Sequence, residues 1–101
     1  MSTVAQLTPA QLAADTTGAR VLDVREADEV AGGAIAGSTH SPLGQLSARH
    51  GELDRTTPIV TVCQSGRRSQ RAAEALPDAG FTVANLDGGM NAWLSDGQPT
   101  A

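Results

Sequence analysis

The sequence predicts an α/β fold in which a parallel sheet is covered by helices on both faces. Short aliphatic stretches alternate with helical segments along the chain, and this alternation is typical of right-handed β-α-β units. Two stretches, residues 20–24 and 58–62, are rich in Val, Leu and Ile, as strands buried on both faces are. The length of 101 residues is sufficient for a single domain with one modest core.

The first half of the chain carries clear helix and strand signals. Thr8 is a suitable N-cap, and Pro9 is favoured at the first helical position because it has no amide proton to leave unpaired. The elements predicted here are a helix from Thr8-Pro9 that Gly18 ends, a strand at residues 20–24, a helical segment at 25–30 closed by Gly32-Gly33, and a short strand centred on Ile35.

The second half carries a similar alternation. Pro77 interrupts a helical pattern, so a boundary is expected at Leu76. The elements predicted here are a helical stretch from Pro42 through the mid-forties, a strand at residues 59–62, a helix from about Ser69, a strand at 81–86, a turn at 87–89 and a final helical turn at 90–94.

Charge and cysteine content exclude several classes of function. The net charge of −4 argues against nucleic-acid or anionic membrane partners. All seven basic residues are arginines, and the cluster of Arg67, Arg68 and Arg71 indicates a local anion site. A single cysteine cannot form an intramolecular disulfide, and neither a secretory signal nor a transmembrane stretch is apparent. We therefore expect a cytoplasmic location.

Cys63, the only cysteine, lies where a strand leads into a helix. The first amides of a helix have no internal partner, and the helix dipole adds partial positive charge, so a thiolate is stabilised at this junction. The residue types therefore favour a nucleophilic thiolate over an inert buried thiol.

The residues after Cys63 are expected to form an anion cradle around the sulfur. Gly66 permits a left-handed turn, and the hydroxyls of Ser65 and Ser69 can add donors. Ser69 is also a candidate N-cap. Arg67 and Arg68 carry guanidinium groups suited to an anionic substrate. The predicted substrate-binding residues are Gln64, Ser65, Gly66, Arg67, Arg68 and Ser69, with Cys63 as the catalytic residue.

The Cys63 segment, CQSGRRS, resembles the C-x-x-G-x-R-S loop of single-domain rhodanese sulfurtransferases. Other stretches resemble further signatures of this family in the same order along the chain. They are VLDVRE at residues 21–26, GAIAGS at 33–38, AGF at 79–81 and LDGGMNAW at 86–93.

The resemblance implies a rhodanese-like, five-stranded parallel sheet flanked by helices, with residues 1–101 as a single rhodanese domain. It implies an enzyme in which Cys63 takes the outer sulfur of thiosulfate or of a persulfide donor. The Cys63 persulfide would then pass this sulfur to cyanide or a thiol. The implied partners are small-molecule donors and acceptors, or a sulfur-carrier or desulfurase protein, and no metal or organic cofactor is required.

Several other residues could belong to a site, but structural roles are expected for them. Asp23 and Arg25, at a strand end, are expected to form a hydrogen bond or ion pair. His40 and His50 are expected in solvated loops rather than paired with Cys63. Trp93 is expected in the core. Arg71 is expected to be a solvated charge.

Three alternative functions remain open. A cysteine phosphatase or arsenate reductase would resemble this scaffold, but those loops place five residues between Cys and Arg, whereas four separate Cys63 from Arg68. A non-catalytic rhodanese-like module usually lacks the cysteine. A sulfur relay within a biosynthetic pathway, with thiosulfate only a surrogate donor, would have the same motif as a thiosulfate sulfurtransferase.

Overall fold

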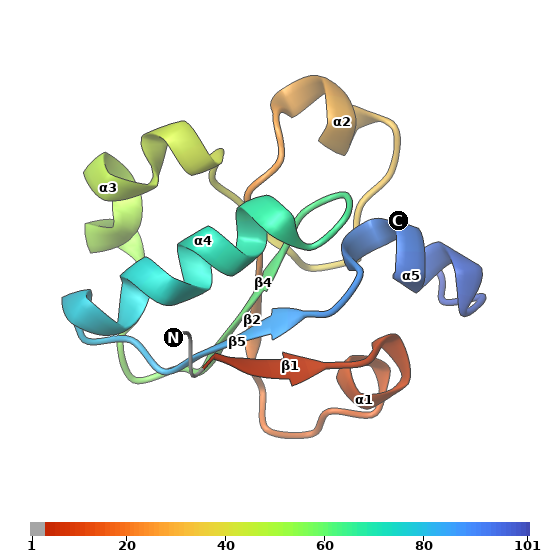
Figure 1. The fold of residues 1–101 in the computed structure, drawn as a ribbon, viewed down its shortest axis with the longest axis horizontal. Helices are drawn as coiled ribbons and strands as arrows, with labels where there is room; N and C mark the ends of the chain where they lie inside the picture. Colours follow the sequence, from red (N-terminus) through yellow and green to blue (C-terminus); the bar gives the residue numbers. More distant parts are fainter. Residues whose placement is uncertain (1–3) are drawn as a thin grey trace.

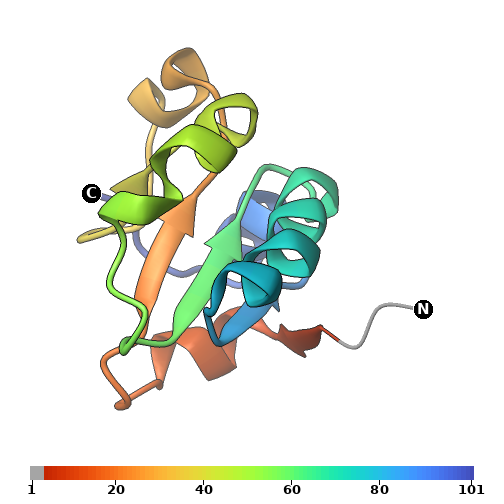
Figure 2. The ribbon, with the colours of Figure 1, turned by 90° about the vertical axis from the view of Figure 1, so that its left-hand side faces the viewer.

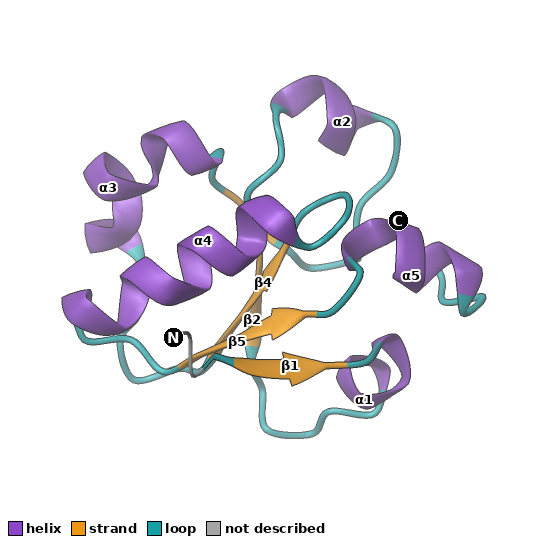
Figure 3. Cartoon of the chain, viewed as in Figure 1, coloured by secondary structure: helices purple, strands orange, loops and turns teal. Residues whose placement is uncertain are grey.

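The computed structural model describes residues 4–101 as one α/β unit built on a five-stranded parallel sheet (Figures 1 and 3). The strand order is β1-β5-β4-β2-β3, and every neighbouring pair is parallel. The strands are β1 (Ala5–Leu7), β2 (Arg20–Asp23), β3 (Thr39–His40), β4 (Ile59–Val62) and β5 (Val83–Leu86). The predicted fold class is confirmed.

Helices cover both faces of this sheet (Figures 1 and 2). The α-helices are α1 (Pro9–Ala13), α2 (Ala27–Ala31), α3 (Leu46–Arg49), α4 (Arg67–Ala75) and α5 (Gly89–Ser95). Short 3-10 turns are η1 (Leu43–Gln45), η2 (His50–Glu52) and η3 (Leu76–Ala79). Within residues 4–101, no helix has the length and apolar character that crossing a membrane requires.

Two apolar clusters, one on each face of the sheet, make up the core. One joins β2 and β4 to α3 and α4 through Leu22, Val24, Leu46, Ile59, Cys63, Ala72, Leu76 and Phe81. The other joins β4 and β5 to α1 and α5 through Leu12, Ile35, Val60, Val62, Leu86, Met90 and Trp93. Successive side chains of a strand point to opposite faces, so β4 contributes to both clusters and is buried along its whole length.

Most of the predicted elements are present. Thr8 caps α1 through a capping box with Gln11, and α4 ends at Ala75, where Pro77 forces a 3-10 turn. Trp93 is buried, as predicted, and its indole N–H donates to the carbonyl of Pro99 at 2.9 Å. These segments have strong local signals, which the folded chain follows.

Two strand assignments differ from the prediction. Ile35 is buried but lies in a non-strand segment between Gly33 and Gly37, whose positive φ angles of 134° and 77° turn the chain too sharply for extended pairing. The short strand is instead β3, which pairs with Leu22 and Asp23 of β2. The predicted elements also omit β1, a three-residue edge strand without a buried side chain.

Candidate active site

Cys63 follows β4 directly, at the carboxyl edge of the sheet where parallel α/β folds bind ligands. Its side chain lies in the core cluster beneath α4, and its exposed fraction is 0%. The helix after the loop begins at Arg67, two residues earlier than predicted, because Gly66 adopts a φ of 99° and acts as N-cap. Ser69 is therefore not the N-cap but lies within the first turn of α4.

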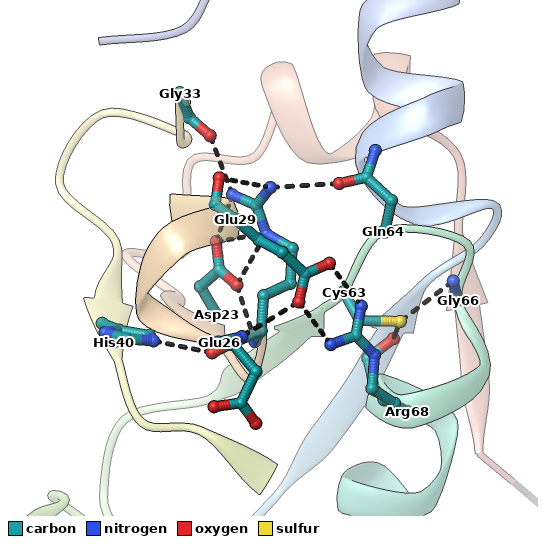
Figure 4. Close-up of polar contacts among 11 residues, drawn as sticks. Asp23, Glu26, Glu29, Gly33, His40, Cys63, Gln64, Gly66 and Arg68 are labelled. Carbon is teal, nitrogen blue, oxygen red and sulfur yellow. Dashed lines mark hydrogen bonds and ion pairs between the residues drawn. The ribbon is translucent and has the colours of Figure 1, made fainter. Parts of the chain in front are cut away.

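The sulfur of Cys63 accepts hydrogen bonds from its own loop (Figure 4). The amide of Gly66 donates to Sγ at 3.0 Å, and the hydroxyl of Ser69 donates to Sγ at 3.2 Å. The backbone carbonyl of Ser69 is held in turn by the hydroxyl of Thr61 in β4, at 3.0 Å. The turn that starts α4 thus directs several donors at one buried atom.

These donors determine the ionisation of the thiol. Burial raises the pKa of Cys63, because a charged sulfur loses its hydration. Hydrogen bonds from the Ser69 hydroxyl and from the amides of Ser69, Gly66 and Ser65 lower this pKa by more. The net shift is downward, so the site favours the thiolate, the form that reacts as a nucleophile.

The start of α5 contacts the back of the Cys63 loop. The amide of Met90 donates to the carbonyl of Cys63 at 2.8 Å, and the amide of Asn91 donates to the carbonyl of Gln64 at 3.0 Å. Gly89, with a φ of 58°, permits this approach, because a Cβ there would collide with the Cys63 carbonyl oxygen and lie 2.8 Å from the carbonyl carbon of Gln64. The turn of residues 87–89 therefore supports the loop directly.

Arg68 is paired across the site with Glu29 of α2 (Figure 4). Its two terminal nitrogens donate to the two carboxylate oxygens at 2.6 and 2.7 Å, a bidentate geometry. This hydrogen bonding lowers the pKa of Glu29 to about 2, and it raises the pKa of Arg68 above its ordinary value. The guanidinium group predicted to hold substrate thus already has an acidic partner.

A buried ion pair fixes the neighbouring strand end. Arg25, 3% exposed, donates to both carboxylate oxygens of Asp23, to the carbonyl of Gly33 at 2.8 Å and to Oε1 of Gln64 at 3.1 Å. Gln64 in turn donates to Oδ1 of Asn91 at 2.7 Å. The structural role expected for Asp23 and Arg25 is present, and Arg25 also fixes the side chain that follows Cys63.

The remaining predicted residues differ in exposure. Ser65 and Arg67 are exposed and border an open hollow beside α4, as does Gly66. His40 is not in a solvated loop but in β3, where its ring nitrogen lies 2.7 Å from the carbonyl oxygen of Arg25. His50 is also partly buried, edge-on against Phe81. Neither histidine ring is hydrogen-bonded to Cys63 within the described residues.

Among the contributors to this site that sequence reasoning missed are Glu29, Gly89 and Met90. Glu29 lies 39 residues from Arg68, and no local pattern reveals that pairing. Met90 contributes its backbone amide, which any residue could supply. The sequence pattern predicts only a turn at Gly88-Gly89, although two adjacent glycines are also a signal for close backbone approach.

Comparison with known proteins identifies the family. The rhodanese-like domain family model matches residues 8–96. A thiosulfate sulfurtransferase of Pseudomonas entomophila, GlpE, is 36% identical over 97 residues, which cover 94% of this chain and 89% of that protein. A putative sulfur carrier protein of Bacillus subtilis, YrkF, is 42% identical over 74 residues, which cover 72% of this chain and 40% of that protein.

Solved structures agree with the sequence comparison. The crystal structure of a rhodanese-related protein from Thermoplasma volcanium superposes with a TM-score of 0.92 at 31% identity, covering 96% of this chain and 97% of that one. The residues that the family model matches, 8–96, include the Cys63 loop. This chain therefore belongs to the rhodanese-like domain family.

Proposed function

We propose that residues 1–101 form a single sulfurtransferase domain that carries sulfane sulfur as a persulfide on Cys63. The observation that supports this most directly is the environment of Sγ. A buried sulfur surrounded by the Gly66 amide and the Ser69 hydroxyl, with its pKa lowered, is suited to hold negative charge at one atom. The same donors would stabilise the outer sulfur of a persulfide.

The reaction requires no external oxidant or reductant. The Cys63 thiolate attacks the outer sulfur of thiosulfate, the Cys63 S–S bond forms, the S–S bond of thiosulfate breaks, and sulfite leaves with the electron pair. The nucleophile cyanide or a thiolate then attacks the outer sulfur of the persulfide. The Cys63 S–S bond breaks, thiocyanate or a new persulfide leaves, and the Cys63 thiolate is restored.

The other loop residues would bind and position the substrate. The exposed guanidinium group of Arg67 would meet anionic donors, and the amides of Ser65 and Gly66 and the hydroxyl of Ser69 would hold the charged sulfur. Gln64 would position the loop through its contacts with Arg25 and Asn91. Arg68, since it is paired with Glu29, would mainly stabilise the loop and would contribute to substrate binding through its positive charge.

Intact-mass spectrometry tests this proposal. Incubation with thiosulfate and no acceptor should add the mass of one sulfur atom, and dithiothreitol should remove it. Cyanide should also remove it and yield thiocyanate, and Cys63→Ser should gain no mass. The same preparation should not hydrolyse aryl phosphates. Phosphatase turnover that disappears in Cys63→Ser, with no persulfide from any donor, would contradict the proposal.

A sulfur relay in the cytoplasm is the second candidate, because a relative is named a putative sulfur carrier protein. In a relay, a persulfide-loaded protein such as a desulfurase would supply the sulfur. Loading rates from thiosulfate and from a persulfidated cysteine desulfurase distinguish the two candidates. A much higher specificity constant for the protein donor would favour the relay, whereas efficient turnover with thiosulfate alone would favour an independent enzyme.

A further inference from the structure

Two of the seven arginines differ from the others in their contacts. Five are held by an acidic side chain or a backbone carbonyl, namely Arg20, Arg25, Arg49, Arg55 and Arg68. Arg67 and Arg71 are exposed and form no ion pair or hydrogen bond through their side chains with any of residues 4–101. Both guanidinium groups are thus available to a ligand.

The placement of these two arginines does not contribute to the stability of the fold. They lie four residues apart on α4, where like charges are neighbours and destabilise a helix by a few tenths of a kcal/mol. Both line the same open hollow of about 750 Å³ between α4 and the strands β1 and β5, which we call the α4 groove. Two unpaired cations bordering one hollow indicate a site for anionic groups.

The α4 groove reaches the reactive loop. Ser65 and Gly66 line it, and the amide of Gly66 is also a donor to the Cys63 sulfur. A ligand in the groove would therefore lie beside a residue whose amide holds the sulfur.

The remaining walls of the groove are polar and of mixed charge. Side-chain amides of Gln6, Gln70 and Asn85 form one hydrogen-bonded cluster there, and the carboxylates of Glu74 and Asp87 also border the hollow. Amide groups can donate to and accept from a peptide bond, and carboxylates attract an ammonium group. The hollow is open to solvent, and its volume of about 750 Å³ is larger than thiosulfate, which has only five heavy atoms, requires.

We propose that the α4 groove binds the sulfur acceptor, a peptide-sized thiol with both carboxylate and ammonium groups, and that Arg67 and Arg71 bind its carboxylates. The inference rests on the proposed function, because it assigns the groove to the second half of that reaction. The acceptor thiolate attacks the outer sulfur of the Cys63 persulfide. The new S–S bond forms on the acceptor, the Cys63 S–S bond breaks, and the Cys63 thiolate leaves.

A binding experiment tests the groove separately from the chemistry. The probe is S-methylglutathione, a zwitterionic peptide whose blocked thiol cannot accept sulfur, and the readout is the amide NMR spectrum. Titration should shift the resonances of Arg67, Gln70, Arg71 and Asn85. Arg71→Glu should weaken binding at least tenfold, and Arg71→Lys should recover part of it. Arg49→Ala, which removes a partly exposed arginine of α3, should bind as the wild type does.

A kinetic experiment then tests the role of the bound thiol. In Arg71→Ala, the ratio of kcat/KM for glutathione to that for cyanide should fall about tenfold, the equivalent of one charge-assisted contact. Arg49→Ala should keep the wild-type ratio. Absence of groove shifts, or a ratio unchanged in Arg71→Ala, while thiosulfate still loads Cys63, would overturn this inference and leave the proposed function intact. Groove binding without any persulfide would overturn the proposed function and the acceptor role together.

Discussion

On its α5 side the Cys63 loop is held mainly by backbone hydrogen bonds, whereas on its α2 side it contacts the charged side chains that Figure 4 shows. The α5 contacts are two amide-to-carbonyl hydrogen bonds, made at a distance that only glycine at position 89 permits, and one side-chain hydrogen bond from Gln64 to Asn91. The α2 contacts are the Glu29–Arg68 ion pair and the Arg25 network. No residue of α2 is buried, so polar contacts are its main attachment to the rest of the domain.

The two sides of the Cys63 loop should therefore respond differently to added side-chain volume, to pH and to salt. Close backbone packing is intolerant of added volume but indifferent to pH and salt, because it involves no titratable group. A half-exposed ion pair tolerates changes of shape but weakens with protonation and with ionic strength. The α5 side should therefore determine whether the loop forms, and the α2 side should adjust how firmly it is held.

Replacing Gly89 by Ala should have the largest effect on stability. The new Cβ meets the carbonyl groups of Cys63 and Gln64, and a φ of 58° is itself unfavourable for Ala. We expect a loss of about 3 kcal/mol or more in the free energy of unfolding, seen in denaturant titrations. The thermal midpoint should fall by at least about 12 °C.

Gly97→Ala is the matched control for this variant. Its φ of 77° is also positive, but a Cβ there would meet nothing within 4 Å. The only unfavourable contribution is the positive φ, so we expect a loss of about 1 kcal/mol in the free energy of unfolding. Equal losses in the two variants would show that close contact between α5 and the loop does not stabilise the domain.

The same contrast explains how far the sequence could predict this site. The strand before Cys63, the glycine within the loop and the cap at Thr8 are local signals, and the structure follows them. Predicting the fold class required little more, because β4 is largely aliphatic and buried along its whole length. The edge strand β1 was missed because its three residues have no buried side chain.

The partners of the loop could not be predicted in this way. The fold brings Glu29 and Arg68 together from positions 39 residues apart, and no local spacing in the sequence indicates that they form a pair. The error at Ile35 has a similar origin: apolar character indicates burial, but it does not distinguish a strand from a turn held between two glycines. The tertiary structure, rather than the local sequence, determines both the Glu29–Arg68 pairing and the turn at Ile35.

Replacing Ser69 by Ala should have an intermediate effect, on the sulfur rather than on the fold. The hydroxyl donates to Sγ at 3.2 Å and lowers the pKa of Cys63, so its loss should move this pKa upward. Alkylation by iodoacetamide at pH 6 should slow roughly tenfold, as expected for one hydrogen bond to a charged acceptor. At a pH where both proteins are fully ionised, the two rates should converge.

Ser65→Ala is the control within the same loop, because Ser65 acts on the sulfur through its backbone amide, which alanine retains. Its alkylation profile should match that of the wild type. A Ser69→Ala profile that also matches the wild type would show that the hydroxyl does not stabilise the thiolate, and the backbone amides would remain as its donors.

The smallest effect is expected on the α2 side, where Glu29→Gln removes the partner of Arg68. The side chains of Glu29 and Arg68 are 28% and 36% exposed, so solvent screening limits the loss in the free energy of unfolding to about 1 kcal/mol at pH 7. The pKa of Glu29 is lowered to about 2 in the folded protein, against about 4.3 in an unfolded chain. This contribution is complete above the unfolded value and is lost as the pH falls toward 2.

The stability difference between wild type and Glu29→Gln should therefore shrink between pH 5 and pH 2, and also in 1 M salt. Denaturant titrations across this range measure it, with Asp28→Asn as control, since Asp28 is exposed on the same helix and its side chain forms no ion pair within residues 4–101. Gly89→Ala should show a loss that is nearly constant over the same conditions. If the difference in the free energy of unfolding between wild type and Glu29→Gln changed with neither pH nor salt, α2 would be held by packing, as α5 is. That result would contradict the contrast between the two sides of the loop.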